Sequence, residues 1–192
     1  LTGQRPPWGT LTGVRPVKLA GMLTDPYREF TEDYRVSSDK AKELVDIYSY
    51  QQEKAGRPAA ASAGIYIGIP FWPTRCLYCS FTSNQADRET IDRYLEALFR
   101  EIEAVGAGMA ERGITAESIY IGGGTPTTLD EYQLDRLLSH IYKHINPDSV
   151  REFTVEAGRP DTITEAKIQA LSEHNIDRIS INPQTMKEET LH

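Results

Sequence analysis

Apolar residues in the last two thirds of the chain follow two alternating periods. Short apolar runs typical of buried strands lie at residues 65–69, 118–121, 152–156 and 176–181. Between them, apolar side chains recur at helical spacing from Ile91 to Ile102, from Leu134 to Ile145, and at Ile168 and Leu171. Single helices between strands require parallel pairing with right-handed crossovers. The pattern therefore predicts an α/β architecture.

The ends of these helices carry their own signals. Gly106 and Gly108 are expected to help stop the first helix, and Asn146-Pro147 to close the second. Thr164 is placed to cap the third helix, which we expect to bury Ile168 and Leu171.

One further helix is predicted before this alternation begins. Ser37 or Ser38 can cap it, one face carries Ala41 and Leu44, and it should end near Gly56. Residues 1–36 are rich in proline and glycine without a sustained period, and small residues at 57–64 indicate a linker. We therefore predict an N-terminal extension with its linker over 1–63 and a second domain over 64–192.

The second domain is too short to close a barrel on its own. An eight-stranded (β/α) barrel takes about 250 residues, so residues 64–192 can hold roughly half of one. Half a barrel would leave unpaired strand edges. We therefore expect the chain to be a fragment whose native sequence continues past His192.

Composition limits the classes of binding partner and the cellular compartment that we expect for the protein. The formal net charge of -7, with no cluster of lysine and arginine, argues against a nucleic-acid partner. No apolar run approaches the roughly 20 residues of a membrane helix, so we expect no membrane partner. Two closely spaced cysteines do not indicate a disulfide framework. These features favour a cytoplasmic protein in a reducing environment.

Both cysteines, Cys76 and Cys79, follow the first strand of the second domain. In a thioredoxin-like pair the second cysteine would lie on the opening turn of a helix, but residues 80–86 are polar and irregular. A structural zinc site would need four ligands, and no second C-x-x-C is present. Two small core residues are a third reading. A metal-binding thiolate pair is the fourth.

The surrounding residues resemble the signature of radical S-adenosylmethionine enzymes. In that signature three cysteines, spaced C-x-x-x-C-x-x-C, each ligate one iron of a four-iron four-sulfur cluster. Cys76 and Cys79 match the second and third positions, whereas Trp72 stands at the first. An indole offers an N–H donor and no in-plane lone pair for iron. The resemblance thus implies Cys76 and Cys79 as metal ligands, with one ligand missing.

Three later motifs are similar, in the same order, to those of the oxygen-independent coproporphyrinogen III oxidase family of that superfamily. They are IGGGTPT at 121–127, VEA at 155–157 and ISINPQ at 179–184. The segment LTGVRP at 11–16 resembles the N-terminal extension of the bacterial coproporphyrinogen dehydrogenase subgroup. The resemblance implies a partial (β/α) barrel of the radical SAM type, roughly its first four β/α units, behind a small N-terminal helical segment.

The same resemblance assigns the contacts to S-adenosylmethionine. They are Tyr66, Tyr78, Gly123, Gly124, Thr125, Glu156 and Gln184. The two glycines and the threonine would bind the methionine part, and Pro126 should hold Thr125 extended. The alternatives are a tight turn for the glycines, solvated strand ends for Glu156 and Gln184, and packing for the tyrosines.

By resemblance, the activity is oxidative decarboxylation of coproporphyrinogen III propionates to vinyl groups in anaerobic haem biosynthesis. It implies a 4Fe-4S cluster, S-adenosyl-L-methionine, a porphyrinogen substrate and an unidentified electron donor. No protein acid or base is assigned as catalytic, because the cofactor carries the chemistry. Arg5, Arg15 and Lys18 are candidate partners for the substrate carboxylates. The alternatives are a haem-binding, chaperone-like or catalytically impaired homologue, or a different radical enzyme on the same core.

His140 and His144 could in principle bind a metal, since they lie four residues apart on a helix. They fall outside the predicted apolar face and beside Arg136 and Lys143. We expect them to be surface residues.

Overall fold

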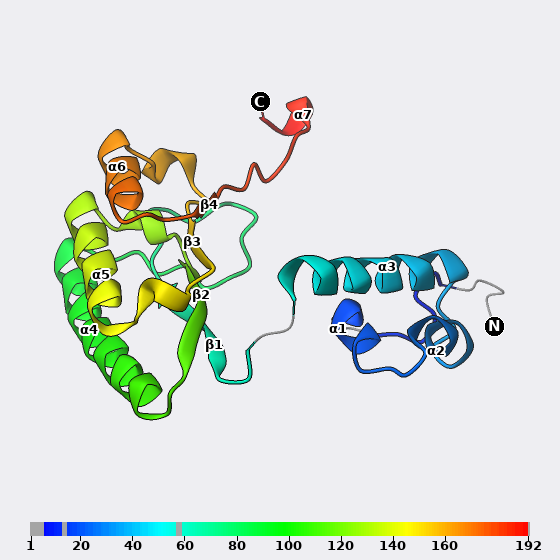
Figure 1. Ribbon diagram of the computed structural model, residues 1–192. Helices are drawn as coiled ribbons and strands as arrows, with labels where there is room; N and C mark the ends of the chain where they lie inside the picture. Colours follow the sequence, from blue (N-terminus) through cyan, green and yellow to red (C-terminus); the bar gives the residue numbers. More distant parts are fainter. Residues whose placement is uncertain (1–5, 13–14, 57–58, 192) are drawn as a thin grey trace. The chain divides into compact units, whose positions relative to one another are not determined.

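The chain falls into two units, Leu1–Arg57 and Pro58–His192 (Figure 1). The computed structural model describes residues 6–12, 15–56 and 59–191. Arg5, a candidate partner for substrate carboxylates, lies outside the described residues. The division into 1–63 and 64–192 stays a prediction.

The first unit consists of helices α1 (Pro16–Ala20), α2 (Pro26–Glu32) and α3 (Ser38–Ala55). Helix α3 and its end at Gly56 confirm the prediction, and Ser37 is the N-cap residue, but its side chain makes no capping hydrogen bond. Helices α1 and α2 were not predicted, because five and seven residues are too few to show a period. Their packing on α3 buries a small core of Ala20, Phe30, Val36, Ala41 and Leu44.

The second unit alternates strands with helices, as predicted. Its elements are β1 (Ser62–Ile69), α4 (Arg88–Glu111), β2 (Thr115–Gly123), α5 (Glu131–His144), β3 (Glu152–Glu156), α6 (Glu165–Glu173), β4 (Arg178–Ser180) and α7 (Glu188–Leu191). Short 3₁₀ turns lie at Pro126–Thr128, Pro147–Ser149 and Pro160–Thr162. The strands form one parallel sheet in the order β1-β2-β3-β4. None of the described helices is long and apolar enough to cross a membrane.

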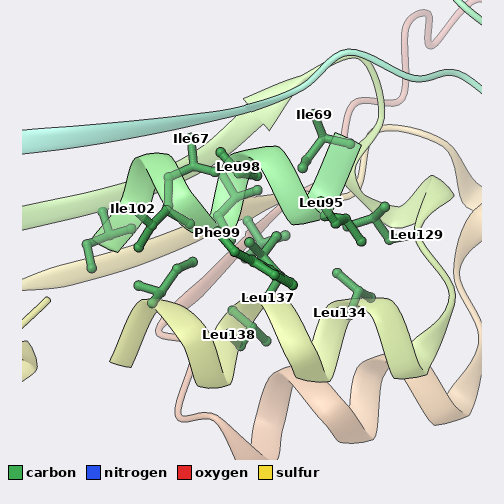
Figure 2. Close-up of a cluster of buried hydrophobic side chains, with 14 of the residues drawn as sticks. Ile67, Ile69, Leu95, Leu98, Phe99, Ile102, Leu129, Leu134, Leu137 and Leu138 are labelled. Carbon is green, nitrogen blue, oxygen red and sulfur yellow. The ribbon is translucent and has the colours of Figure 1, made fainter. Parts of the chain in front are cut away.

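Helices α4, α5 and α6 cover one face of this sheet (Figure 1). Alternate strand residues point to that face and are almost fully buried: Ile67, Ile69, Ile119, Ile121, Phe153 and Val155. Figure 2 shows two of them, Ile67 and Ile69, above the leucines of α4 and α5, which point towards the strands and one another. The opposite face carries Tyr66, Gly68, Tyr120, Gly122, Thr154, Glu156, Arg178 and Ser180. We call it the polar face.

Two expectations about the helices were wrong. Helix α4 does not stop at Gly106 or Gly108 but continues to Glu111, before Gly113 at a φ of +63°. Gly106 is instead buried against the end of α5, where it allows a close approach of two helices. Ile168 is 38% exposed, so α6 buries Ala170 and Leu171.

The expectation for the two histidines was also wrong, because both are partly buried between α4 and α5. The His140 ring stacks on Phe99 with 4.6 Å between centroids, and its Nε2 lies 2.9 Å from the Phe99 carbonyl oxygen. The His144 ring lies 4.4 Å from that of His140. Contact between α4 and α5 covers part of both rings, and the helical period alone did not reveal this contact.

The close approach at Gly106 gives a stability prediction. A Cβ there would lie 2.2 Å from the backbone oxygen of His144, so the two helices would have to separate. We expect Gly106→Ala to lower the free energy of unfolding by about 1–3 kcal/mol, although alanine is the better helix former. Gly108→Ala is the matched control, since a Cβ there meets only the flexible end of the Arg112 side chain. Urea denaturation of both variants checks this; equal stability would contradict it.

Candidate functional site

A cleft of about 840 Å³ lies within the second unit at the carboxyl ends of the strands. Open parallel sheets and barrels place their ligand sites at this edge, and the volume falls in the range of small-molecule pockets. Its lining includes eight of the nine predicted site residues: Cys76, Tyr78, Cys79, Gly123, Gly124, Thr125, Glu156 and Gln184. The ninth, Tyr66, lies outside the cleft on the polar face.

Backbone hydrogen bonds join the cysteine loop to the glycine-rich loop. The Gly124 N–H donates to the Ile69 carbonyl at 2.8 Å, and the Thr125 N–H donates to the Phe71 carbonyl at 2.8 Å. A Cβ on Gly124 would lie 2.4 Å from the Phe71 oxygen, and Gly123 has a φ of +112°. These glycines are therefore required by the approach of the chain to itself. Thr125 is extended, as predicted from Pro126, and its side chain is buried.

Two free thiols and an indole occupy the cysteine loop. Cys76 and Cys79 are partly buried, and a backbone bond of 3.0 Å from the Cys79 N–H to the Cys76 carbonyl closes a turn between them. The Trp72 ring packs on the glycine-rich loop, because a Cβ on Gly124 would lie 2.9 Å from its Cδ2 atom. Trp72 therefore lines the same cleft as the thiols.

Arg159, which the sequence reasoning missed, connects the loop after β3 to the cysteine loop. Its guanidinium pairs with both oxygens of Asp161, at 3.1 and 2.9 Å. Nη2 also donates to the Thr74 hydroxyl at 2.9 Å, and Nη1 lies 3.4 Å from both the Thr74 carbonyl oxygen and the Cys76 Sγ. The Arg159 side chain is 23% exposed. An arginine fork held by a carboxylate is a rigid donor, so it fixes this loop.

Glu156, the last residue of β3, has a partner that the motif comparison did not include. The Tyr120 hydroxyl donates a hydrogen bond to Glu156 Oε1 at 2.6 Å, and this bond raises the pKa of Tyr120 to about 12. The Tyr120 ring stacks on Tyr66 with centroids 5.7 Å apart. The signal was present in the sequence: strand alternation puts both tyrosines on the polar face, and they are register partners.

Lys167, on helix α6, joins the glycine-rich loop to the loop after β3 through hydrogen bonds. Its Nζ donates to the carbonyls of Thr127 at 2.7 Å and Thr162 at 3.0 Å, and the two threonine hydroxyls lie 2.6 Å apart. Burial lowers the pKa of Lys167. A lysine one turn into a helix gives no sequence signal for this role, because the partners are backbone atoms of distant loops.

The remaining candidates are more exposed. Tyr78 is 71% exposed, and a hydrogen bond with Cys76 raises its pKa. Gln184 is exposed and has a φ of 65°, which is uncommon for a residue other than glycine. Arg15 and Lys18 are exposed in the first unit.

The cleft thus combines a backbone loop, a carboxylate, a fixed guanidinium and two thiols on a rigid sheet edge. In a comparison with protein families, the family described as "Radical SAM superfamily" matches residues 67–192. The chain belongs to the Radical SAM superfamily. Its fold and its motif order agree with that membership.

Several relatives in the superfamily are known by name. The oxygen-independent coproporphyrinogen-III oxidase-like protein HemZ of Bacillus subtilis is 39% identical over 99% of this chain and 40% of its own length. The heme chaperone HemW of the same organism is 37% identical over 66% of this chain and 33% of its own. The solved structure of coproporphyrinogen III oxidase (HemN) from Escherichia coli is 27% identical, with a TM-score of 0.58, over 73% of this chain and 32% of that chain. The chain therefore spans less than half the length of these relatives.

The superfamily uses a 4Fe-4S cluster and S-adenosylmethionine. The cleft has the size and the polar groups for the nucleotide cofactor, but the donor set for the cluster is incomplete. Cys76 and Cys79 supply two thiols, and the first position of the cysteine signature holds the Trp72 indole. Among the described residues, no group of three or more His, Cys, Asp or Glu side chains could hold a metal ion.

The position of Arg159 leads to a prediction about the cysteine loop without any cofactor. Arg159→Met removes the fork to Thr74 and the contact with Cys76, so residues 72–82 should open more often. We expect their backbone amides to exchange with deuterium about fivefold faster or more. Mass spectrometry of peptides from this loop measures the rate.

The control for Arg159→Met is Arg112→Met, which removes an exposed arginine at the end of α4. It should leave exchange in residues 72–82 unchanged. Equal exchange rates in both variants would show that Arg159 does not hold the loop.

Proposed function

We propose that the protein acts in haem biosynthesis as an oxygen-independent coproporphyrinogen III oxidase. In this reaction a propionate side chain loses carbon dioxide, one hydrogen atom and one electron, and a vinyl group remains. The observation that carries the proposal is the gathering of eight of the nine motif residues around one cleft. The names of two relatives, HemZ and HemN, point to the same reaction.

The residues of the cleft suggest how a sulfonium nucleotide would be held. The backbone of Gly123 and Gly124 and the side chain of Glu156 offer acceptors and donors for an amino acid's charged ends. Tyr66, Tyr78 and Gln184 remain proposed contacts. Arg15 and Lys18 remain candidate partners for the carboxylates of the porphyrinogen.

Trp72 limits this function. A 4Fe-4S cluster of this superfamily needs three thiolates, and the indole cannot replace one. The missing thiolate would bind the metal directly. Even changes to residues that only contact the metal ligands cost about 10–100-fold in metal affinity. We therefore propose that the chain as it stands loads the cluster poorly and turns over slowly as a consequence.

The test is anaerobic reconstitution with iron and sulfide of the protein and of its Trp72→Cys variant. We expect the unsubstituted protein to hold about a tenth or less of the iron held by Trp72→Cys. Iron analysis and the visible absorbance of the cluster provide the measurement.

Ser80→Cys is the matched control, because it adds a third thiol to the same loop at the wrong spacing. It should not restore iron to the Trp72→Cys level. Equal iron in the unsubstituted protein and Trp72→Cys would overturn the assignment of position 72 as the third ligand.

A second function is favoured by the incomplete donor set together with the similarity to HemW, which is named a heme chaperone. A protein of this kind would bind haem without turnover. Titration of the protein with haem, followed by absorbance, and chromatography for cleavage products of S-adenosylmethionine separate the two functions. Tight one-to-one haem binding by both the unsubstituted protein and Trp72→Cys, without cleavage in either, would support the chaperone. Cleavage by Trp72→Cys would support the oxidase.

A further inference from the structure

Two polar groups and an aromatic ring of the polar face converge on the backbone of Gly122. A Cβ at this glycine would lie 2.8 Å from the Tyr66 hydroxyl oxygen, 2.8 Å from the Tyr120 ring and 3.1 Å from Glu156 Oε2. The missing side chain therefore leaves room for a hydroxyl and a carboxylate oxygen over the same residue. Gly122 comes directly before the glycines assigned to the cofactor.

Tyr120 constrains both of these groups at once. Its hydroxyl holds Glu156 Oε1 at 2.6 Å, while its ring is nearly parallel to that of Tyr66, with an interplanar angle of 12°. Oε2 and the Tyr66 hydroxyl both lie over Gly122. Because the pKa of Tyr120 is raised to about 12, its hydroxyl remains a donor over the whole physiological range.

The nearby cation on the polar face is paired with a carboxylate other than Glu156. Arg178, the cation on the neighbouring strand, is engaged with Glu152 at 3.0 Å and with Thr154 at 3.1 Å. Among the described residues Glu156 forms no ion pair, and Tyr120 is its hydrogen-bond donor. A carboxylate oxygen and a phenol oxygen over the same glycine offer two acceptors for a ligand N–H or O–H group.

We propose that Tyr120 is a positioning residue: it fixes Glu156 and Tyr66 so that Oε2 and the phenol oxygen together accept a hydrogen-bond donor of the ligand, an ammonium or a hydroxyl group. The inference rests on the proposed function, which makes the ligand S-adenosylmethionine. It adds a residue that the motifs do not include and a reason for the placement of Glu156.

The experiment measures the affinity of S-adenosylmethionine by anaerobic calorimetry. Tyr120→Phe keeps the stacked ring and removes the hydrogen bond to Glu156, so we expect binding to weaken by about tenfold. Every form is made in the unsubstituted protein and again with a reconstituted Trp72→Cys background of matched iron content. This second series prevents the missing thiol from masking the effect.

Tyr142→Phe is the matched control. Tyr142 also donates a 2.6 Å hydrogen bond, to the carbonyl of His174, and also lies parallel to a neighbouring ring, but on the helix-covered side of the sheet. It should lower stability in urea as much as Tyr120→Phe does while leaving the affinity unchanged. A merely structural Tyr120 would behave in the same way as this control.

A double-mutant cycle identifies the partner through which Tyr120 acts. In a Glu156→Gln background, Tyr120→Phe should have little further effect on the affinity, because the two changes remove the same arrangement. If Glu156→Gln weakens binding and Tyr120→Phe does not, the positioning role is wrong and the proposed function stands. If no form binds S-adenosylmethionine, including Trp72→Cys alone, the proposed function fails and this inference with it.

Discussion

Parallel pairing of β1 with β2 continues beyond the ends of both strands, and the candidate site depends on this continuation. The bonds from Gly124 to Ile69 and from Thr125 to Phe71 hold the glycine-rich loop and the start of the cysteine loop side by side. Two loops that are far apart in the sequence thereby become one wall of a cleft. The hydrophobic contacts of Ile67, Ile69 and Ile121 with α4 and α5 fix the strands, and the loops inherit their position.

The fold could be predicted from the sequence to the extent that periodicity determines it. Buried strands, such as the one that contains Phe153 and Val155, have strong hydrophobic periods, and so do helices with a long apolar face. The order of these strands and helices along the chain predicts a parallel sheet. Contacts between elements have no period, which is why the packing of Gly106 against α5 and the burial of His140 were missed. Helices α1 and α2 were missed because their stability comes from tertiary packing.

The candidate site divides in the same manner. Motif residues at strand ends, such as Glu156 and Gly123, could be assigned from their order along the chain. Tyr120, Arg159 and Lys167 could not, because each acts through a partner on a distant loop or a neighbouring strand. Trp72 is a different case: the sequence showed the missing thiol, and the structure adds that the indole packs on the glycine-rich loop. Tryptophan at position 72 therefore removes one proposed cluster ligand, while its ring still fills part of the cleft.

The strands stand in the sheet in the order in which they occur along the chain, β1-β2-β3-β4. During synthesis, each new strand consequently reaches a neighbour that has already left the ribosome, and no strand must be inserted between two others. Pairing can proceed from one edge to the other with moderate loop closures, each spanned by a single helix. The sheet can thus assemble in the direction of translation, and the cysteine loop, directly after β1, emerges before the glycine-rich loop with which it pairs.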